Sequence, residues 1–522
     1  MITRKSQINE LETYSGTWDI CIIGGGASGL GIAVDAASRG YKTILFEKYD
    51  FAKGTSSRST KLVHGGVRYL QQGNIKLVMD ALRERGIMKK NAPHLVKNQS
   101  FIVPNYKWWE GPYYGLGLKV YDWMSGSLGL GASEWLSTEE VLQHAPTLDP
   151  EGLRGGVIYH DGQFDDSRLA LNLAQTAIEQ GGTVLNYFNV KNFIKTENKI
   201  AGVIVEDTLD NKQFEIKANV VINATGVFSD AIQQLDEPGK ESTITPSQGI
   251  HIVLDKEFLP GKSAIMIPHT DDGRVLFAVP WHEKTIVGTT DTLVDDIDPE
   301  PLAREEEIEF LITHAARYLT KDPTMKDVRS IYAGLRPLVK NTAKKTAEIS
   351  RDHSIIISDS GLVSIVGGKW TTYRKMAADT VNTAAVHAML PYKECITNEL
   401  RIHGAVDTEE IYGTDYYYGS DLPLIATLIT ENLTFADPIH ARLPYRQGEI
   451  VWAVRNEMCM TVEDALSRRT RALLLDASAA VESSPLVAKL MATELGYDQQ
   501  WIETQVKEFY EVAKSYLPSN NK

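Results

Sequence analysis

The stretch WDICIIGGGASGLGIAVDAASRGYKTILFEKYD, residues 18–50, decides the fold of this chain. A short apolar, β-branched run, Asp19–Ile23, is typical of a buried strand and leads directly into a glycine-rich turn. A helix is predicted from about Leu30 to Arg39, and a second strand from Lys42 to Glu47. A strand, a G-x-G-x-x-G turn at Gly24, Gly26 and Gly29, a helix and a second strand, in this order, indicate a dinucleotide-binding unit.

Each part of this unit has a physical role. The glycines permit a tight turn, let the backbone approach a pyrophosphate and let the helix pack closely on the strand. The N-terminus of the helix directs unpaired N–H groups at the phosphates. Glu47 follows about 20 residues after the glycines, where a carboxylate accepts hydrogen bonds from ribose hydroxyls. Its negative charge argues against a cofactor that carries a 2′-phosphate.

Length and composition are those of a globular protein with more than one core. The chain has 522 residues, of which 43% are hydrophobic and 23% charged, and we expect two or three domains. We see no secretory signal and no apolar run of about 18 residues that would span a bilayer. Cys21, Cys395 and Cys459 form no C-x-x-C motif, so we expect reduced thiols, a cytosolic protein and no metal site.

The net charge of −14 disfavours nucleic acid as a partner, but one region is basic. From Lys53 to Lys119 there are twelve Lys or Arg against three acidic residues, a local charge of +9. A phosphate-bearing ligand and an anionic membrane surface both fit this region, and a solvated face is the simpler alternative. Residues 108–130 add aromatic and apolar side chains, which belong either on lipid headgroups or in a buried core. The predicted helix Ile75–Lys90 contributes five cations, Lys76, Arg83, Arg85, Lys89 and Lys90.

Helix and strand patterns divide the chain into three parts. We expect a nucleotide-binding domain built from residues 15–93, 164–230 and 330–390, and a strand-rich substrate domain from residues 94–163 and 231–329. Residues 391–522 have a helical pattern and form a third domain. The predicted fold class is α/β: a Rossmann-like domain, an interleaved strand-rich domain and a C-terminal α-helical domain. The runs behind this division include Asp166–Gln180, Phe214–Lys217, Val220–Asn223, Ile250–Leu254, Val275–Val279, Thr285–Thr289, Glu449–Asn456, Val462–Leu473 and Leu486–Leu495.

A second motif, TSSRSTKLVHGGVRYL at residues 55–70, follows the second strand of the nucleotide unit. Rich in hydroxyl groups and cations, it can run along the rest of a bound dinucleotide. Gly65 and Gly66 would let the backbone lie close to a flat ring, with Arg68 and Tyr69 placing donors just beyond it. A helix start with N-capping serines is the structural alternative.

A third motif, LVSIVGGKWTTYR at residues 362–374, predicts a strand that ends at Gly-Gly and a helix that begins near Thr371 or Thr372. The positive end of such a helix stabilises the negative charge that a reduced flavin carries at its N1 and C2 edge. NAD has no such requirement, and the chain has no second G-x-G-x-x-G for a nicotinamide cofactor. The motif therefore favours a flavin that the substrate reduces directly, with an ordinary strand–turn–helix junction as the alternative.

Cations from separate segments favour an anionic substrate. Arg336 lies in GLRPL, Arg351 in SRDH, and Lys369 in the third motif, and with Arg68 they suit a phosphate group. His251 lies in an apolar strand, QGIHI, where it is either a satisfied core residue or a base.

On these motifs the chain resembles the FAD-dependent, quinone-linked glycerol-3-phosphate dehydrogenases. KLVHGGVRY at residues 61–69 is the most specific motif, and the similarity extends through APH, NATG, GTTD, GLRPL, SRDH and GGKWTTYR into the C-terminal segment with Glu449 and residues 464–470. The resemblance implies FAD as cofactor, oxidation of sn-glycerol 3-phosphate to dihydroxyacetone phosphate, and a membrane quinone as electron acceptor. It also implies a cytoplasmic enzyme held peripherally on the inner face of the cell membrane. The oligomeric state stays open, with a homodimer as one option.

The resemblance also assigns residues. Substrate binding falls to Arg68, Tyr69, Arg336, Arg351 and Lys369, and catalysis to His251, Arg336 and Lys369. Arg58 and Thr60 replace smaller residues of some relatives, which leaves the flavin contacts of that loop open. The residues expected to bind FAD are Gly24, Gly26, Ala27, Ser28, Gly29, Glu47, Thr55, Ser56, Ser57, Lys61, His64, Gly65, Gly66, Ala224, Gly226, Gly334, Gly368, Lys369 and Thr371.

The predicted reaction is hydride transfer from C2 of the substrate to flavin N5. His251 takes the proton of the C2 hydroxyl, or the cationic cluster lowers the pKa of that hydroxyl instead. Two other functions compete with this prediction. One is a glycerol-3-phosphate oxidase, which would release peroxide instead of reducing quinone. The other is an FAD-binding regulatory or RNA-modifying flavoprotein, whose flavin glycerol 3-phosphate would not bleach.

Overall fold

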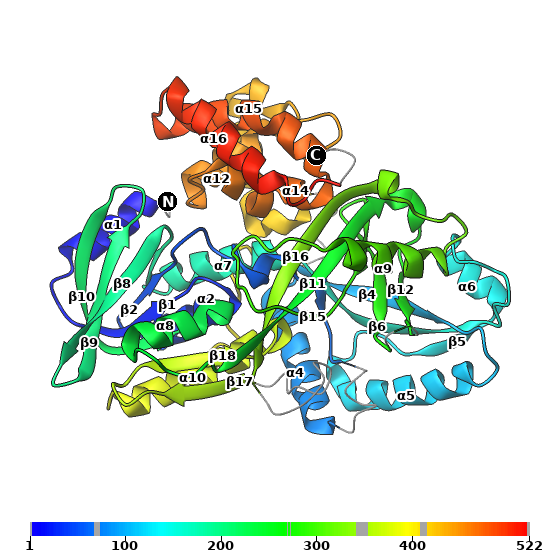
Figure 1. Ribbon diagram of the computed structural model, residues 1–522, viewed down its shortest axis with the longest axis horizontal. Coiled ribbons are helices and arrows are strands. Elements are labelled where there is room, and N and C mark those ends of the chain that lie inside the picture. The colour runs from blue at the N-terminus through cyan, green and yellow to red at the C-terminus, as the bar shows by residue number, and fades with distance from the viewer. Residues whose placement is uncertain are drawn as a thin grey trace.

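The computed structural model describes residues 3–66, 74–268, 270–271, 273–340, 353–407 and 415–518. Within these residues, two β-sheets and a group of C-terminal helices make up the molecule (Figure 1). The α/β fold class predicted from the sequence is confirmed.

The first sheet is the centre of the nucleotide-binding domain. Its strands follow the order β17-β18-β10-β1-β2-β7. In addition, β9 pairs with the first half of β10, and β8 pairs with β9. β1 runs parallel to both β2 and β10, so its apolar side chains are buried on both faces, as expected of a central parallel strand. The strands are β1 (Trp18–Ile23), β2 (Thr43–Phe46), β7 (Thr183–Leu185), β8 (Phe188–Thr196), β9 (Lys199–Asp207), β10 (Lys212–Asn223), β17 (His353–Ile357) and β18 (Val363–Gly367).

The second sheet contains most of the segments that were predicted to form the substrate domain. Its strands follow the order β15-β11-β14-β13-β12-β4-β6-β3, with β16 paired to β11 and β5 paired to β6. β3 and β4 come from the N-terminal part of the chain, so the second motif passes from one sheet to the other. The strands are β3 (Leu62–Val63), β4 (Val96–Pro104), β5 (Glu134–Leu136), β6 (Gly156–Phe164), β11 (Ile244–Asp255), β12 (Ala264–Ile267), β13 (Leu276–Trp281), β14 (Lys284–Gly288), β15 (Thr292–Leu293) and β16 (Val328–Val339).

Helices cover the first sheet and build the C-terminal domain. The α-helices outside that domain are α1 (Arg4–Thr13), α2 (Ala27–Ser38), α4 (Ile75–Asn91), α5 (Glu110–Ser125), α6 (Thr138–His144), α7 (Asp166–Glu179), α8 (Ser229–Asp236), α9 (Glu305–Ala316) and α10 (Tyr373–His387). Those of the C-terminal domain are α11 (Leu422–Glu431), α12 (Gln447–Asn456), α13 (Val462–Asp464), α14 (Ala472–Leu475), α15 (Ala477–Leu495) and α16 (Gln499–Ala513). α2 packs between α7 and α10. The C-terminal helices and the pair α4 and α5 lie on opposite sides of the molecule (Figure 1). In the described part of the chain, no helix combines the length and apolar composition that a bilayer crossing requires.

The structure differs from the predicted divisions in three places. β16 pairs with β11 along its length, so residues 330–339 lie in the second sheet and not in the nucleotide-binding sheet. The segments predicted at 214–217 and 220–223 are one continuous strand, β10, which pairs with β9 at its start and with β1 at its end. The helix predicted at 462–473 is interrupted, because Ala465–Arg469 is a π-helical turn and Arg471 adopts a left-handed conformation.

The insert at 94–163 also contains more helix than expected. Residues 110–125 form α5, whose Tyr114, Leu118 and Tyr121 are buried against the second sheet. Trp123 of the same helix is 83% exposed, so the alternative of a buried core describes only part of this aromatic segment.

Candidate active site

The glycine-rich turn has the geometry that the dinucleotide motif predicts. Gly24 has a φ of +107° and lies where a Cβ would be 2.8 Å from the Ala224 carbonyl oxygen. A Cβ at Gly29 would lie 1.8 Å from the carbonyl oxygen of Gly24, so only glycine lets α2 pack this closely on the turn. Gly26 is the N-cap of α2 and has no side chain to cover the helix end. The N-terminus of α2 is therefore open to an anion.

Glu47 is oriented by the same turn. Its Oε2 accepts a hydrogen bond of 2.6 Å from the Gly25 N–H, and its Oε1 accepts one of 2.8 Å from the Tyr49 N–H. Burial raises the pKa of Glu47, and these two hydrogen bonds oppose that shift. A carboxylate oxygen has two lone pairs, so both oxygens keep the capacity to accept from ribose hydroxyls.

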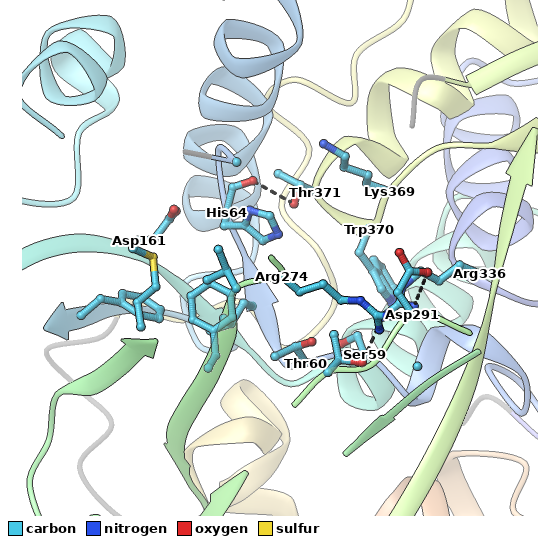
Figure 2. A pocket seen from close by; sticks show the side chains of 18 of the residues that line it. Ser59, Thr60, His64, Asp161, Arg274, Asp291, Arg336, Lys369, Trp370 and Thr371 are labelled. Carbon is cyan, nitrogen blue, oxygen red and sulfur yellow. Dashed lines mark hydrogen bonds and ion pairs between the residues drawn. The ribbon is translucent and has the colours of Figure 1, made fainter. Parts of the chain in front are cut away.

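A cavity of 1040 Å³ lies between the two sheets. Figure 2 shows side chains from both sheets around it, among them His64, Arg336 and Lys369. A volume of this size suits a large cofactor ring together with a small substrate. The predicted site residues that line the cavity are Thr55, His64, Gly66, His251, Gly334, Arg336, Gly368, Lys369 and Thr371.

Arg336 lies on β16 and is held by the chain segment that follows β14. Its Nη2 donates to the hydroxyl of Thr289 and to the carbonyl of Thr290, both at 3.0 Å, and its Nη1 donates to Asp291 at 3.4 Å. Gly249 on the neighbouring β11 makes room for the guanidinium, because a Cβ there would lie 2.2 Å from Nη2. The guanidinium is therefore fixed in the cavity wall before a substrate arrives.

His251 lies on β11 and is 2% exposed. Its Nε2 is 2.9 Å from the Thr60 hydroxyl, and its ring stacks on Tyr332 with centroids 4.6 Å apart. Burial lowers the pKa of His251 well below its usual value, and the charges of Arg336 and Lys61 lower it further. The imidazole is therefore neutral at pH 7, which allows it to accept a proton but makes it a weak base.

Lys369 and Thr371 lie in the turn that the third motif predicts. β18 ends at Gly367, and a 3₁₀ turn at Trp370–Thr372 leads into α10. Gly367 and Gly368 both have positive φ, at +78° and +90°. The Thr371 hydroxyl lies 3.5 Å from the His64 carbonyl, so the second and third motifs meet at the cavity (Figure 2). The prediction of a helix N-terminus at this place is confirmed.

Gly65 has a different neighbour from the one expected. A Cβ at this position would lie 2.4 Å from both the Tyr121 hydroxyl and a Leu82 methyl group, so its space is taken by α5 and α4. The Gly65 N–H also donates to the Tyr121 hydroxyl at 2.8 Å, and that hydroxyl donates to Asp161 at 2.7 Å. Gly66 has a φ of +78° and is the member of the pair that lines the cavity.

Lys61 is predicted to contact FAD, yet its side chain lies in the protein interior. Its Nζ pairs with Asp166 at 2.8 Å and donates to the Ser57 carbonyl at 2.6 Å, with both charged side chains fully buried. The other predicted residues away from the cavity lie at the carboxyl end of the first sheet, where a nucleotide is expected to bind. They are Gly24, Gly26, Ala27, Ser28, Gly29, Glu47, Ser56, Ala224 and Gly226. Arg68, Tyr69 and Arg351 lie outside the described residues.

Several residues of the cavity were not predicted from the sequence. Asp291 and Thr289 orient Arg336, and Arg274 extends into the cavity from the segment between β12 and β13 (Figure 2). The signal for two of them was present in GTTD, which directly follows a strand, but nothing in that motif shows which cation it faces. An apolar wall completes the cavity, with Phe101, Trp109, Tyr113, Tyr114, Leu116, Leu118, Tyr159, Met266 and Phe277.

The residues present fit a flavin dinucleotide. The turn at Gly24–Gly29 with the open N-terminus of α2 suits a pyrophosphate, and Glu47 suits the ribose. The flat cavity wall at Gly66 and the helix start at Thr371 suit the ring system and its anionic edge.

Comparison with known proteins agrees with this assignment. The model of a family described as FAD dependent oxidoreductase matches residues 19–374, and one described as the C-terminal domain of alpha-glycerophosphate oxidase matches residues 362–502. The mitochondrial glycerol-3-phosphate dehydrogenase of Macaca fascicularis is 38% identical and aligns with 99% of this chain and 75% of that protein. The enzyme of the same name from Schizosaccharomyces pombe is 37% identical and aligns with 99% of this chain and 89% of that protein.

Solved structures give the same result. The glycerol-3-phosphate dehydrogenase from Bacillus halodurans, complexed with FAD, superposes with a TM-score of 0.81 at 30% identity and covers 99% of both chains. The L-alpha-glycerophosphate oxidase from Mycoplasma pneumoniae, with FAD bound, has a TM-score of 0.56 at 18% identity over 74% of this chain, which shows a shared fold. The family resemblance and the FAD cofactor predicted from the motifs are confirmed. The chain belongs to the family of FAD-dependent glycerol-3-phosphate dehydrogenases.

Proposed function

We propose that this protein oxidises sn-glycerol 3-phosphate to dihydroxyacetone phosphate and passes the electrons to a membrane quinone. The full-length similarity to proteins named glycerol-3-phosphate dehydrogenase supports the substrate. The observation that carries the proposal is a pre-oriented guanidinium, that of Arg336, in a cavity next to the start of α10.

The cavity offers the groups that a small phosphomonoester requires. Arg336, Arg274 and Lys369 line one continuous space and supply cations for a phosphate. Arg336 suits this role best, because its planar guanidinium binds a phosphate through two parallel hydrogen bonds. Apolar side chains line the other side of the same cavity, and the lower local dielectric beside them strengthens electrostatic interactions.

Residues of the chain itself accept the proton of the substrate hydroxyl and stabilise the charge that forms on its oxygen. When bound, FAD supplies the hydride acceptor. His251 is neutral and is positioned by Thr60 and Tyr332, so it can accept the hydroxyl proton. The cations of Arg336 and Lys369 stabilise negative charge on the substrate oxygen and lower the pKa of the hydroxyl. These two contributions are complementary, because a weak base needs an acidified hydroxyl.

One experiment tests the substrate directly. Anaerobic addition of sn-glycerol 3-phosphate to the purified holoenzyme should bleach the absorbance of the oxidised flavin, whereas glycerol, which lacks the phosphate, should not. A flavin that stays oxidised would reject the proposed substrate. Peroxide release at the rate of quinone reduction would instead identify an oxidase.

A second surface supports a membrane acceptor. α5 and its N-terminal flank expose Trp108 and Trp123 at 79% and 83%, and Leu116, which also borders the cavity, at 69%. Aromatic side chains of this kind favour the membrane interface, and an apolar patch on a protein surface marks an interaction site. Leu116 also lines the cavity, so the exposed patch of α5 reaches the site. We propose that α5 lies on the inner face of the cell membrane.

The cations of α4 add to this surface. Lys76, Arg83 and Lys90 are exposed, which suits anionic lipid headgroups. Arg85 does not take part, because its side chain is 1% exposed and pairs with Asp161 at 2.8 Å.

A further inference from the structure

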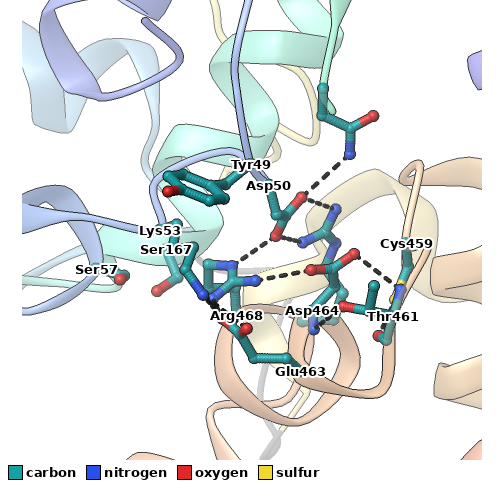
Figure 3. A network of polar contacts seen from close by, with 12 residues as sticks. Tyr49, Asp50, Lys53, Ser57, Ser167, Cys459, Thr461, Glu463, Asp464 and Arg468 are labelled. Atoms are coloured by element: carbon teal, nitrogen blue, oxygen red, sulfur yellow. Dashed lines mark hydrogen bonds and ion pairs between the residues drawn. The ribbon is translucent and has the colours of Figure 1, made fainter. Parts of the chain in front are cut away.

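Buried ion pairs join the C-terminal domain to the loop of the nucleotide-binding domain that follows β2. Asp50 is fully buried and accepts hydrogen bonds from Arg468 Nε at 2.5 Å and from Arg469 Nη2 at 2.9 Å. Three residues later, the Lys53 ammonium contacts Glu463 at 2.6 Å. We call these five residues the clamp, and Figure 3 shows most of them in one network. Two points of a single loop are therefore fixed by side chains more than 400 residues away in the sequence.

The backbone of the C-terminal domain is shaped to make these contacts. Arg468 and Arg469 lie at the end of the π-helical turn Ala465–Arg469, in which the Thr470 N–H bonds to the Ala465 carbonyl at 3.0 Å. Consecutive residues of a regular helix point about 100° apart. Both guanidinium groups nevertheless reach one carboxylate. π-Helical turns of this kind occur preferentially at functional positions.

The clamped loop carries the groups that face the nucleotide. Glu47, three residues before Asp50, receives the Gly25 N–H of the glycine turn. Ser56, three residues after Lys53, receives the N–H of Ala27 at 2.9 Å in the first turn of α2. Between them, the Ala52 N–H donates to the Gly25 carbonyl at 3.0 Å. The loop thus lies along the whole glycine turn, and the clamp holds its middle.

The two carboxylates of the clamp are ionised under ordinary conditions. Although burial opposes ionisation, the guanidinium groups of Arg469 and Arg468 lower the pKa of Asp50 to about 2. In the same way, Arg468 and Lys53 lower the pKa of Glu463 to about 2 against the effect of burial. Removal of Glu463 or of Lys53 breaks the contact between the loop and the C-terminal domain at this point, and the remaining charges keep only their other partners, Glu300 for Lys53 and Arg468 for Glu463. Loss of one partner from a buried ion-pair network is unfavourable. The loop therefore keeps this position as long as the C-terminal domain is docked.

We infer that the C-terminal helical domain retains FAD by holding the ribose–pyrophosphate loop, residues 47–57, through the clamp. No member of the clamp lines the substrate cavity. Its loss should therefore affect how long the cofactor stays bound and leave the chemical step of a loaded enzyme unchanged.

The test compares Glu463→Gln and Lys53→Met in the full-length holoenzyme. FAD release is followed by the gain in flavin fluorescence after dilution, and turnover is measured per bound flavin. We expect each variant to release FAD at least about tenfold faster, with turnover per flavin within about twofold of wild type. The double variant should release FAD no faster than the more severe single variant, because both changes remove the same contact.

Glu494→Gln is the matched control. It breaks an ion pair with Arg455 at 2.6 Å within the C-terminal domain, between α12 and α15, and leaves the loop contacts in place. FAD release within about twofold of wild type in both clamp variants, or equal acceleration in the control, would overturn the inference. If Glu463→Gln does not fold, the rate of FAD release from Lys53→Met alone tests the inference, with the same thresholds.

Discussion

Arg336 donates to a threonine hydroxyl, a backbone carbonyl and the carboxylate of Asp291. A guanidinium anchored in this way loses little conformational freedom when a phosphate binds, because its orientation is already set. Asp291 has a second effect, since a carboxylate beside the cation competes with an anionic ligand. The attraction by the Arg336 guanidinium and the competition from the Asp291 carboxylate together determine how strongly this wall of the cavity binds a phosphate.

Arg336→Ala tests the contribution of this side chain. Loss of the guanidinium should lower kcat/KM for glycerol 3-phosphate by roughly two orders of magnitude or more, about 3 kcal/mol of transition-state stabilisation. Steady-state kinetics with a quinone analogue measures this change. Arg336→Lys keeps the charge but not the fork of donors, and it should recover only part of the loss. A turnover close to that of wild type would remove Arg336 from the site.

Gly249→Ala tests the packing that seats the same guanidinium. The added methyl group would lie 2.2 Å from Arg336 Nη2 and 2.5 Å from the Thr289 hydroxyl, so Arg336 must move. A misplacement of this size should lower kcat/KM by roughly tenfold to a hundredfold. Gly54→Ala is the control, because a Cβ there meets nothing within 4 Å. Equal kcat/KM values for Gly249→Ala and Gly54→Ala would show that the space at Gly249 does not position Arg336.

At the scale of elements, α5 has two apolar sides with different surroundings. One side packs on the second sheet, whereas the other is exposed, and residues from both sides line the cavity. This arrangement explains why α5 contains more apolar residues than its buried side requires. It also places an exposed aromatic surface within one helix diameter of the site.

Trp123→Ser combined with Trp108→Ser tests this surface, because neither side chain lines the cavity. The double change should weaken co-sedimentation with anionic liposomes by at least about tenfold, because each side chain loses roughly 1.5 kcal/mol or more of apolar burial. Binding of the wild type should also fall with added salt, since the cations of α4 contribute. Leu433→Gln, at a 78% exposed position of the C-terminal domain, is the control. Unchanged binding of the double variant would exclude α5 as the contact.

Elements with a local pattern could be predicted from the sequence. The strand, turn, helix and strand at residues 18–47 appear almost as expected, because the glycines and the periodicity of α2 act within a few residues. β16 could not be placed in the same way. Its apolar pattern suits either sheet, and only its pairing with β11 decides between them.

At the scale of the whole molecule, the chain joins its parts through charged pairs that are remote in sequence. Arg336 and Lys369 were predicted because each lies in a distinctive motif, whereas Arg274 was not. Asp291 lies in the motif GTTD and Thr60 in the second motif, but neither motif shows that Asp291 contacts Arg336 or that Thr60 contacts His251, since these pairings depend on which strands become neighbours. The same holds for Arg469 and Asp50, whose pairing no pattern of spacing could indicate.

His403 joins two parts of the molecule and predicts a pH-dependent stability. It contacts Asp421, just before α11, at 3.0 Å and Glu179 of α7 at 2.6 Å. Burial opposes its charge, but the two carboxylates raise the pKa of His403 to about 9. Because the folded pKa exceeds the unfolded one of about 6.5, this stabilisation is complete below pH 6.5 and is lost as pH rises through 9.

His403→Gln should therefore lower the free energy of unfolding more at pH 6 than above pH 9. We expect a difference of about 1–3 kcal/mol, reduced by the partial exposure of Glu179. Urea unfolding at the two pH values measures it. An equal loss of stability at both values would show that the ion pairs of His403 do not stabilise the fold.

The clamp also bears on how this protein acquires its flavin during synthesis. Asp50 and Arg469 are 419 positions apart, so the ribosome must translate more than 400 further codons after that of Asp50 before the loop can be secured. At about 5–20 residues per second, this interval is roughly 20–80 s. A nascent chain would expose a complete glycine fingerprint throughout that time, before the clamp can hold the adjoining loop. Slow release of FAD is then a property that the chain acquires late, only after the segment with Arg468 and Arg469 has been made.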